Sequence, residues 1–215
     1  MLTSDAIVAA AAQVLARDGY AGLTMRAIAD ELGVQAPALY WYVTSKEELQ
    51  VLLYDHLMAG FEVSVAGADW RDNIREAAQQ LRRHMRGKRD ISLLAPHDFR
   101  LGPNSVAQLD AGLAMLRQAG LSDRDAAYGF NMLYGFVLNW VAGESEWNQR
   151  VDAAGGEFTG TTESGILAQF DPVAHRNVAE LASHLAADDI DGRFEFGLGC
   201  MIAGLERLIS RPKPP

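Results

Sequence analysis

The chain carries TMRAIADELGVQAPALYWYVTSK at residues 24–46, and this segment predicts two short helices joined by a tight turn. Thr24 can cap the first helix, and Gly33 ends it because glycine tolerates the left-handed backbone that follows many helices. Pro37 suits the first turn of the second helix, where its missing N–H costs nothing. Two helices so joined form a helix-turn-helix, which can place its second helix in the major groove of DNA. We therefore expect a DNA-binding unit here.

The rest of the chain also predicts helices, so the expected fold class is all-α. Apolar residues recur at helical spacing, and no segment alternates with period two between hairpin turns. Helices are expected over residues 3–19, 45–61, 70–85, 105–119, 122–150, 172–185 and 191–209, with a flexible loop at 155–162. The pattern loosens over residues 60–69. We therefore expect a helix-turn-helix domain at residues 1–60 and a larger helical domain at residues 61–215.

Composition restricts the class of protein further. The 215 residues are 49% hydrophobic and 22% charged, which is the balance of an ordinary globular protein. The single cysteine, Cys200, excludes an internal disulfide framework and a Cys-rich zinc site, and its apolar neighbours predict a buried, unreactive thiol. The first residues lack a basic region and include Asp5, so they do not resemble a signal peptide. We expect a cytoplasmic protein.

The charge of the chain is unusual for a DNA-binding protein. The net charge is −9, and residues 1–50 contain three Lys or Arg against six Asp or Glu. Affinity for a duplex comes largely from neutralising phosphates. Binding must therefore depend on a few well-placed cations and hydroxyl groups, with a shallow dependence on salt, and the acidity argues against sequence-independent coating of DNA.

The tip of the second helix, from Gln35 to Ala38, offers groups for base edges. The Gln35 amide can bond an adenine edge, and alanine methyl groups can touch thymine methyl groups. Beside the tip, hydroxyl groups and cations for phosphates come from Tyr40, Tyr42, Arg26 and Lys46. Consecutive helical residues point about 100° apart, so three aromatic side chains in a row cannot all be buried. Trp41 by itself fits either the core or the DNA surface.

The segment GLTMRAIADELGVQAPALYWYVTSKEEL resembles the N-terminal domain of the TetR (tetracycline repressor) family, over residues 4–58. Its motif is Gly-hydrophobic-Thr-x-Arg, then Leu-Gly-Val, Pro-x-Leu-Tyr and Lys-x-x-Leu. The resemblance implies a DNA surface, and with Trp41 added the candidates are Thr24, Arg26, Gln35, Ala36, Pro37, Ala38, Tyr40, Trp41, Tyr42 and Lys46. Positions 36 and 38 often carry polar base-reading residues in the family but are alanine here. Gln35, Tyr42 and DNA shape are therefore expected to carry more of the specificity.

Two uncharged segments in the second half predict a homodimer. Residues 126–143 and 196–205 contain no charged residue. The length of the first would permit a membrane span, but its three glycines, its two asparagines and the acids around it favour a helix buried in protein, so no membrane partner is expected. Two copies of the chain can cover such helices as a four-helix interface across a two-fold axis. We expect a dimer through residues 122–150 and 191–209.

The segments WRDNIREAAQQLRR, LAMLRQAGLS and FEFGLGCMIAGLERLI are similar to the ligand-binding, dimerising domain of the tetracycline repressor subgroup. This similarity implies a pocket for a largely apolar small-molecule effector, although every pocket residue fits an ordinary core position equally well. The candidate residues are Phe61, Leu81, His97, Phe99, Leu109, Leu113, Leu116, Ala127, Phe130, Asn131 and Tyr134, with Ala77 and Gly112 beside them. The last four candidates have the spacing i, i+3, i+4, i+7, which puts them on one helix face.

Departures from the tetracycline repressors concern the ligand. Those proteins hold a magnesium–drug complex with histidines and position the drug with an asparagine. Here Glu62 stands at the first histidine position and Ala77 at the asparagine position. His97 and Asp98 either bind a polar ligand group or lie in a solvated loop. We therefore expect no metal and no cofactor, and an effector other than tetracycline–magnesium.

These patterns favour a homodimeric repressor that a small molecule releases from a palindromic operator, with the helix over 45–61 as the lever. An enzyme is not expected, because no nucleophile–base spacing, metal cluster or phosphate loop is present. The acidic first domain and the alanines at 36 and 38 leave an alternative. In that alternative the chain is a dimeric helical ligand-binding or adaptor protein with weak or lost DNA binding.

Overall fold

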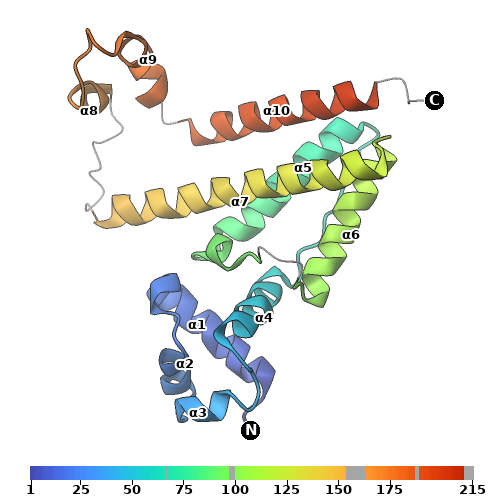
Figure 1. Ribbon diagram of the computed structural model, residues 1–215, viewed down its shortest axis with the longest axis vertical. Helices are drawn as coiled ribbons and strands as arrows, with labels where there is room; N and C mark the ends of the chain where they lie inside the picture. Colours follow the sequence, from blue (N-terminus) through green and yellow to red (C-terminus); the bar gives the residue numbers. More distant parts are fainter. Residues whose placement is uncertain (66, 97–99, 154–162, 187–188, 211–215) are drawn as a thin grey trace. The chain divides into compact units, whose positions relative to one another are not determined.

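A computed structural model describes residues 1–65, 67–96, 100–153, 163–186 and 189–210, and every regular element in them is helical (Figure 1). The all-α prediction is confirmed. The elements are α1 (Ser4–Gly22), α2 (Met25–Leu32), α3 (Ala36–Leu39), α4 (Lys46–Met58), α5 (Trp70–Arg86), the 3-10 helix η1 (Ile91–Leu94), α6 (Pro103–Gln118), α7 (Asp123–Ala153), α8 (Glu163–Leu167), α9 (Arg176–Ala186) and α10 (Ile190–Ile209). They form two compact units, residues 1–145 with 198–215, and residues 146–197.

Helix α1 organises the N-terminal helices, packing against α2 and α4. The Thr3 side chain caps it by accepting the Ala6 N–H at 3.1 Å. Gly19 interrupts the helix as expected, with φ at 73°, and one further turn reaches Gly22. The Asp90 carboxylate accepts the Tyr20 N–H at 2.9 Å, and a Cβ on Gly19 would lie 2.8 Å from that carboxylate. Glycine is therefore required by both the backbone angle and the close approach.

The turn between α2 and α3 has the expected left-handed residue. Thr24 caps α2 through the Ala27 N–H at 3.1 Å, and Gly33 has φ 66°. The Val34 N–H bonds the Ala29 carbonyl and the Gly33 N–H bonds the Asp30 carbonyl, which are the paired bonds of a Schellman motif. Both predicted helices of the motif are confirmed.

Helix α4 begins as predicted and ends earlier. Ser45 caps it by accepting the Glu48 N–H at 3.1 Å. The Glu48 carboxylate reaches back to the Thr44 N–H and hydroxyl, one residue beyond the Ser45 N–H that a capping box uses. These bonds lower the pKa of Glu48. The helix stops at Met58 instead of Phe61, because Gly60 turns the chain with φ 75°.

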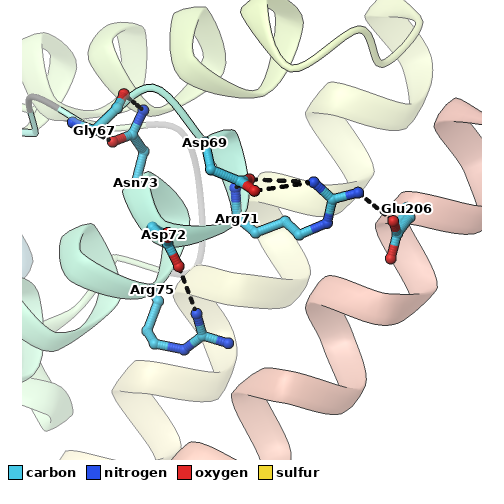
Figure 2. A network of polar contacts seen from close by, with 7 residues as sticks. All are labelled: Gly67, Asp69, Arg71, Asp72, Asn73, Arg75 and Glu206. Atoms are coloured by element: carbon cyan, nitrogen blue, oxygen red, sulfur yellow. Dashed lines mark hydrogen bonds and ion pairs between the residues drawn. The ribbon is translucent and has the colours of Figure 1, made fainter.

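Polar contacts tie α5 to its neighbours in the first unit. The Asp69 carboxylate caps α5 by accepting the Arg71 N–H at 2.8 Å. The Arg71 guanidinium bonds both Asp69 and Glu206 of α10, as Figure 2 shows. Further along α5, Arg82 forms an ion pair with Glu144 of α7, and both side chains are nine-tenths or more buried. These contacts hold α5 against the two long helices.

The second unit differs from expectation in its short helices. The helix α8 was not predicted, and it packs against α9. Helix α9 begins at Arg176 instead of residue 172, because Asp171 first closes a turn in which its side chain accepts the Val173 N–H at 2.9 Å. The predicted loop at 155–162 lies outside the described residues. None of the helices in the described ranges is both long and apolar enough to cross a membrane.

One expectation about burial is wrong for the single chain, since Cys200 on α10 is exposed, not buried. Helix α7 is not covered on all sides by its own chain, because Tyr128 is 61% and Met132 is 41% exposed. This exposure agrees with the expectation that a second copy covers the helix. Helical spacing identifies an apolar face but does not say whether the same chain covers it.

A carboxylate of α4 caps α6 from outside that helix. No side chain of α6 or its preceding residue caps it. Instead Asp55, which is 6% exposed, accepts the Ser105 N–H at 2.8 Å and the Asn104 side-chain N–H at 2.9 Å. A Cβ on Gly102 would lie 2.2 Å from the Asp55 carboxyl carbon, so glycine makes room for the carboxylate. This contact fastens α4 to α6.

Replacing Asp55 by alanine tests that contact. We expect Asp55→Ala to lower the free energy of unfolding by about 1–3 kcal/mol, because it leaves buried N–H groups without an acceptor. Urea unfolding at fixed protein concentration measures the change. The control is Asp110→Ala on the exposed face of α6, and an equal loss in both variants would contradict the assignment.

Candidate nucleic-acid interface and ligand cavity

The candidate DNA contacts lie at the surface of the N-terminal helices. Thr24, Arg26, Gln35, Pro37 and Lys46 are exposed, and Ala36 and Ala38 are half-buried. The aromatic run is also exposed, at 51% for Tyr40, 88% for Trp41 and 42% for Tyr42. Trp41 is therefore not a core residue. The apolar positions that hold α2 and α3 in place, Ile28 and Leu39, are fully buried.

The cations of the N-terminal helices differ in whether an acidic side chain of the same protein binds them. The Arg17 guanidinium bonds Asp18 at 3.0 Å and Glu31 at 2.6 Å, and these bonds raise its pKa. Lys46 lies over the Tyr20 ring, with its Nζ 5.6 Å from the ring centroid. Arg26 has no ion-pair partner among the residues that the structure describes. Arg26 and Lys46 are thus the exposed cations of these helices that no acid among the described residues holds.

An apolar cavity lies between α5, α6 and α7, with about 580 Å³ of space that includes its opening to solvent. No charged side chain lines it, and the polar side chains in its lining are Gln108 and Tyr134. The Phe130 and Tyr134 rings stack with centroids 5.5 Å apart and an interplanar angle of 13°. The lining residues are Phe61, Val63, Ile74, Ala77, Ala78, Leu81, Gln108, Gly112, Met115, Leu116, Phe130, Leu133, Tyr134 and Val137.

About half of the ligand-binding residues predicted from the sequence line the cavity. Phe61, Leu81, Leu116, Phe130 and Tyr134 line it, together with Ala77 and Gly112. Leu109, Leu113, Ala127 and Asn131 do not, and Asn131 is exposed. His97 and Phe99, with Asp98, lie outside the described residues.

The structure corrects the prediction of which face of α7 turns to the cavity. The expected set 127, 130, 131 and 134 is replaced by 130, 133, 134 and 137. Both sets have helical spacing, so periodicity alone does not choose between them. Leu133 and Val137 are buried at 9% and 1% exposure, and their apolar character was the signal that could have pointed to this face.

The sequence interpretation also missed residues that join α4 to the cavity. The hydroxyl groups of Tyr54 on α4 and Tyr134 on α7 are hydrogen-bonded. Burial raises the pKa of both phenols, so both stay protonated. On the last turn of α4, the Leu57 carbonyl lies 3.0 Å from His84 Nε2 of α5, and the Met58 carbonyl accepts the Gln108 amide N–H of α6 at 3.1 Å.

The other end of α4 belongs to the N-terminal helices. The Gln50 amide donates to the Tyr20 hydroxyl of α1 at 2.8 Å, and Leu49 and Leu53 are fully buried. Helix α4 thus has its first turns bonded to the helix-turn-helix unit and its last turns bonded to all three helices of the cavity. Through α4, the cavity helices are therefore connected to α1, which packs against α2.

The described residues contain no group of three His, Cys, Asp or Glu side chains close enough to hold a metal ion. Ala77 lines the cavity, and Glu62 is exposed. The cavity is therefore suited to a ligand bound mainly by apolar contacts.

Comparisons with known proteins agree with this arrangement. Residues 7–51 match the family described as bacterial regulatory proteins, tetR family, and residues 65–209 match the tetracyclin repressor-like C-terminal domain. The chain is 31% identical to an HTH-type transcriptional regulator of Saccharopolyspora erythraea over 208 residues, which cover 95% of this chain and 85% of the relative. It is 31% identical to the Escherichia coli tetracycline repressor protein class A from transposon 1721, over 98% of this chain and 94% of the repressor.

Solved structures give the same result. The crystal structure of the Streptomyces coelicolor TetR family protein ActR in complex with actinorhodin superposes with a TM-score of 0.82 and 32% identity, over 95% of each chain. The helix-turn-helix, the helical domain behind it and these matches over nearly the whole length lead to one assignment. The chain belongs to the TetR family and is a DNA-binding transcriptional regulator.

Proposed function

We propose that the protein is a homodimeric repressor that leaves a palindromic operator when a largely apolar small molecule enters the cavity between α5, α6 and α7. The observation that carries this proposal is the double attachment of α4, to α1 through Gln50 and to the cavity helices through Tyr54, Leu57 and Met58. A ligand that favours one arrangement of the cavity helices thereby favours one position of the recognition helix. The activity of the protein on operator DNA supports a location in the cytoplasm.

The domain boundary is proposed at Gly60, with DNA binding in residues 1–60 and ligand binding and dimerisation in residues 61–215. The turn at Gly60, after the last residue of α4, supports this division. The dimer is proposed to form through residues 122–150 and 191–209. Exposed apolar side chains support it, since Tyr128 and Met132 on α7 and Phe196 on α10 are 61%, 41% and 75% exposed.

The effector is proposed to be a flat molecule of fused rings. The stacked rings of Phe130 and Tyr134, with Phe61, offer flat apolar walls, and an apolar enclosure excludes a ligand with bare charges. The likeness to ActR, which has been crystallised with actinorhodin, supports a small organic ligand. The residues proposed to contact it are the candidates that line the cavity, with Leu133 and Val137 added.

The proposed DNA surface predicts different roles for two exposed arginines. We expect Arg26→Ala to weaken operator binding and to make the negative slope of log K against log salt shallower by about 1, because one phosphate contact is lost. Arg17→Ala is the matched control, since Arg17 is already engaged by Asp18 and Glu31. Fluorescence anisotropy over a series of salt concentrations measures both slopes. Equal slopes for Arg26→Ala and wild type would refute the phosphate contact.

The repressor proposal also predicts the form of the operator. Footprinting is expected to protect an inverted repeat with half-site centres about one duplex turn, roughly 34 Å, apart or a near multiple. The double variant Tyr42→Ala/Lys46→Ala is expected to abolish protection while keeping its fold by circular dichroism. The absence of an inverted repeat would reject the dimeric repressor, and unchanged protection by the variant would reject this surface.

Filling the cavity tests the effector site. In a thermal-shift screen of fused-ring aromatic compounds, we expect some to raise the Tm of the wild type by mass action. Ala78→Leu is expected to remove the shift, because Ala78 lines the cavity and is 7% exposed. Ala107→Leu on the exposed face of α6 is the control and keeps the shift. A shift that survives in Ala78→Leu would place the ligand elsewhere.

A further inference from the structure

The two polar side chains of the cavity lining are both hydrogen-bonded to α4. Tyr134 bonds the Tyr54 hydroxyl and Gln108 bonds the Met58 carbonyl, so both are bonded to α4. Every other side chain in the lining is apolar. A polar atom of a ligand in this cavity therefore meets a group that is already connected to α4.

The hydroxyl groups of Tyr54 and Tyr134 have two protons between them, and the hydrogen bond that joins them uses only one. Each hydroxyl can donate one hydrogen bond and also accept, and neither phenol bonds any other group among the described residues. Tyr54 is 1% exposed, so its proton has an acceptor only in Tyr134. An undonated O–H in an apolar enclosure is unfavourable. The favoured arrangement has Tyr54 donating to Tyr134, which leaves the Tyr134 proton for the cavity that its side chain lines.

We propose that Tyr134 determines which effectors the protein accepts, by donating a hydrogen bond to an acceptor oxygen on an otherwise apolar, fused-ring molecule, while Tyr54 orients that hydroxyl from α4. This inference rests on the proposed function, because it names the chemistry of the effector that the cavity takes. Carbonyl, ether and phenolic oxygens share the required property. A ring system of the same shape without such an oxygen fills the cavity but leaves the Tyr134 proton without a partner.

The same two hydroxyls connect the effector to the DNA-binding unit. Hydrogen bonds in a chain polarise and strengthen one another. An oxygen that accepts from Tyr134 makes the Tyr134 oxygen a better acceptor for Tyr54. The effector therefore stabilises the arrangement in which α4 and α7 are joined through this pair, and an apolar molecule of the same shape does so less.

The test compares two probes with one three-ring skeleton, 9-fluorenone and fluorene, which differ in one carbonyl oxygen. Isothermal titration calorimetry on the full-length protein gives the ratio of the Kd of fluorene to the Kd of fluorenone. In Tyr134→Phe this ratio is expected to fall by about three- to tenfold relative to wild type, which is the value of one neutral hydrogen bond. Comparing the ratio between proteins cancels the different hydration of the two probes.

Gln118→Ala is the control, because it removes a polar side chain from α6 at a position that is exposed and outside the cavity lining. It is expected to leave the ratio unchanged. Tyr54→Phe tests the positioning role and remains informative if Tyr134→Phe does not fold. It is expected to lower the ratio without changing the Kd of fluorene. In the double variant Tyr54→Phe/Tyr134→Phe the ratio falls no further than in Tyr134→Phe.

The outcomes separate this inference from the proposed function. If both probes bind the wild type and Tyr134→Phe leaves the ratio unchanged, the role of Tyr134 is refuted and the effector cavity stands. If the effects of the two single variants add, Tyr54 does not act through Tyr134. If neither probe binds the wild type, the fused-ring effector class is wrong, and this inference fails with it.

Discussion

The Asp55 carboxylate supplies the acceptors that the first turn of α6 lacks, and the position of α4 depends on this contact. A helix begins with N–H groups that have no partner inside the helix, and α6 has no capping side chain of its own. Because the acceptor comes from α4, α6 cannot satisfy its first turn without holding α4 in register. Tyr54 and Met58, one residue before and three after Asp55, then meet Tyr134 and Gln108.

This arrangement explains how a cavity lined almost entirely by apolar groups can be coupled to DNA binding. Apolar contacts supply affinity but little direction, whereas hydrogen bonds require particular atoms to face one another. The hydrogen bonds of the cavity lining go to α4, and α4 is bonded at its first turns to α1. In the proposed mechanism, affinity and coupling thus come from different side chains of the same cavity.

The acidity of the N-terminal helices is easier to understand from the contacts than from the net charge. Glu31 and Asp18 are paired with Arg17, and Glu48 accepts two bonds from Thr44. These acids serve the fold of the small helices, and their charge is partly offset by their partners. Arg26 and Lys46, with the exposed aromatic run, remain on the surface at which we propose DNA binding. Few cations suffice when a dimer fixes the spacing of two recognition helices.

Local patterns in the sequence determined the helices and the DNA-binding motif, because caps and glycine turns are decided within a few residues. Thr24 and Ser45 cap their helices, and Gly33 ends α2. Only the tertiary structure decided which face of α7 meets the cavity, since Asn131 and Leu133 fit helical spacing equally well. It also decided that Trp41 is exposed, that Asp55 caps α6 and that Tyr54 meets Tyr134. These depend on contacts between residues about 50 to 80 positions apart, and no short-range pattern encodes which distant group a side chain will meet.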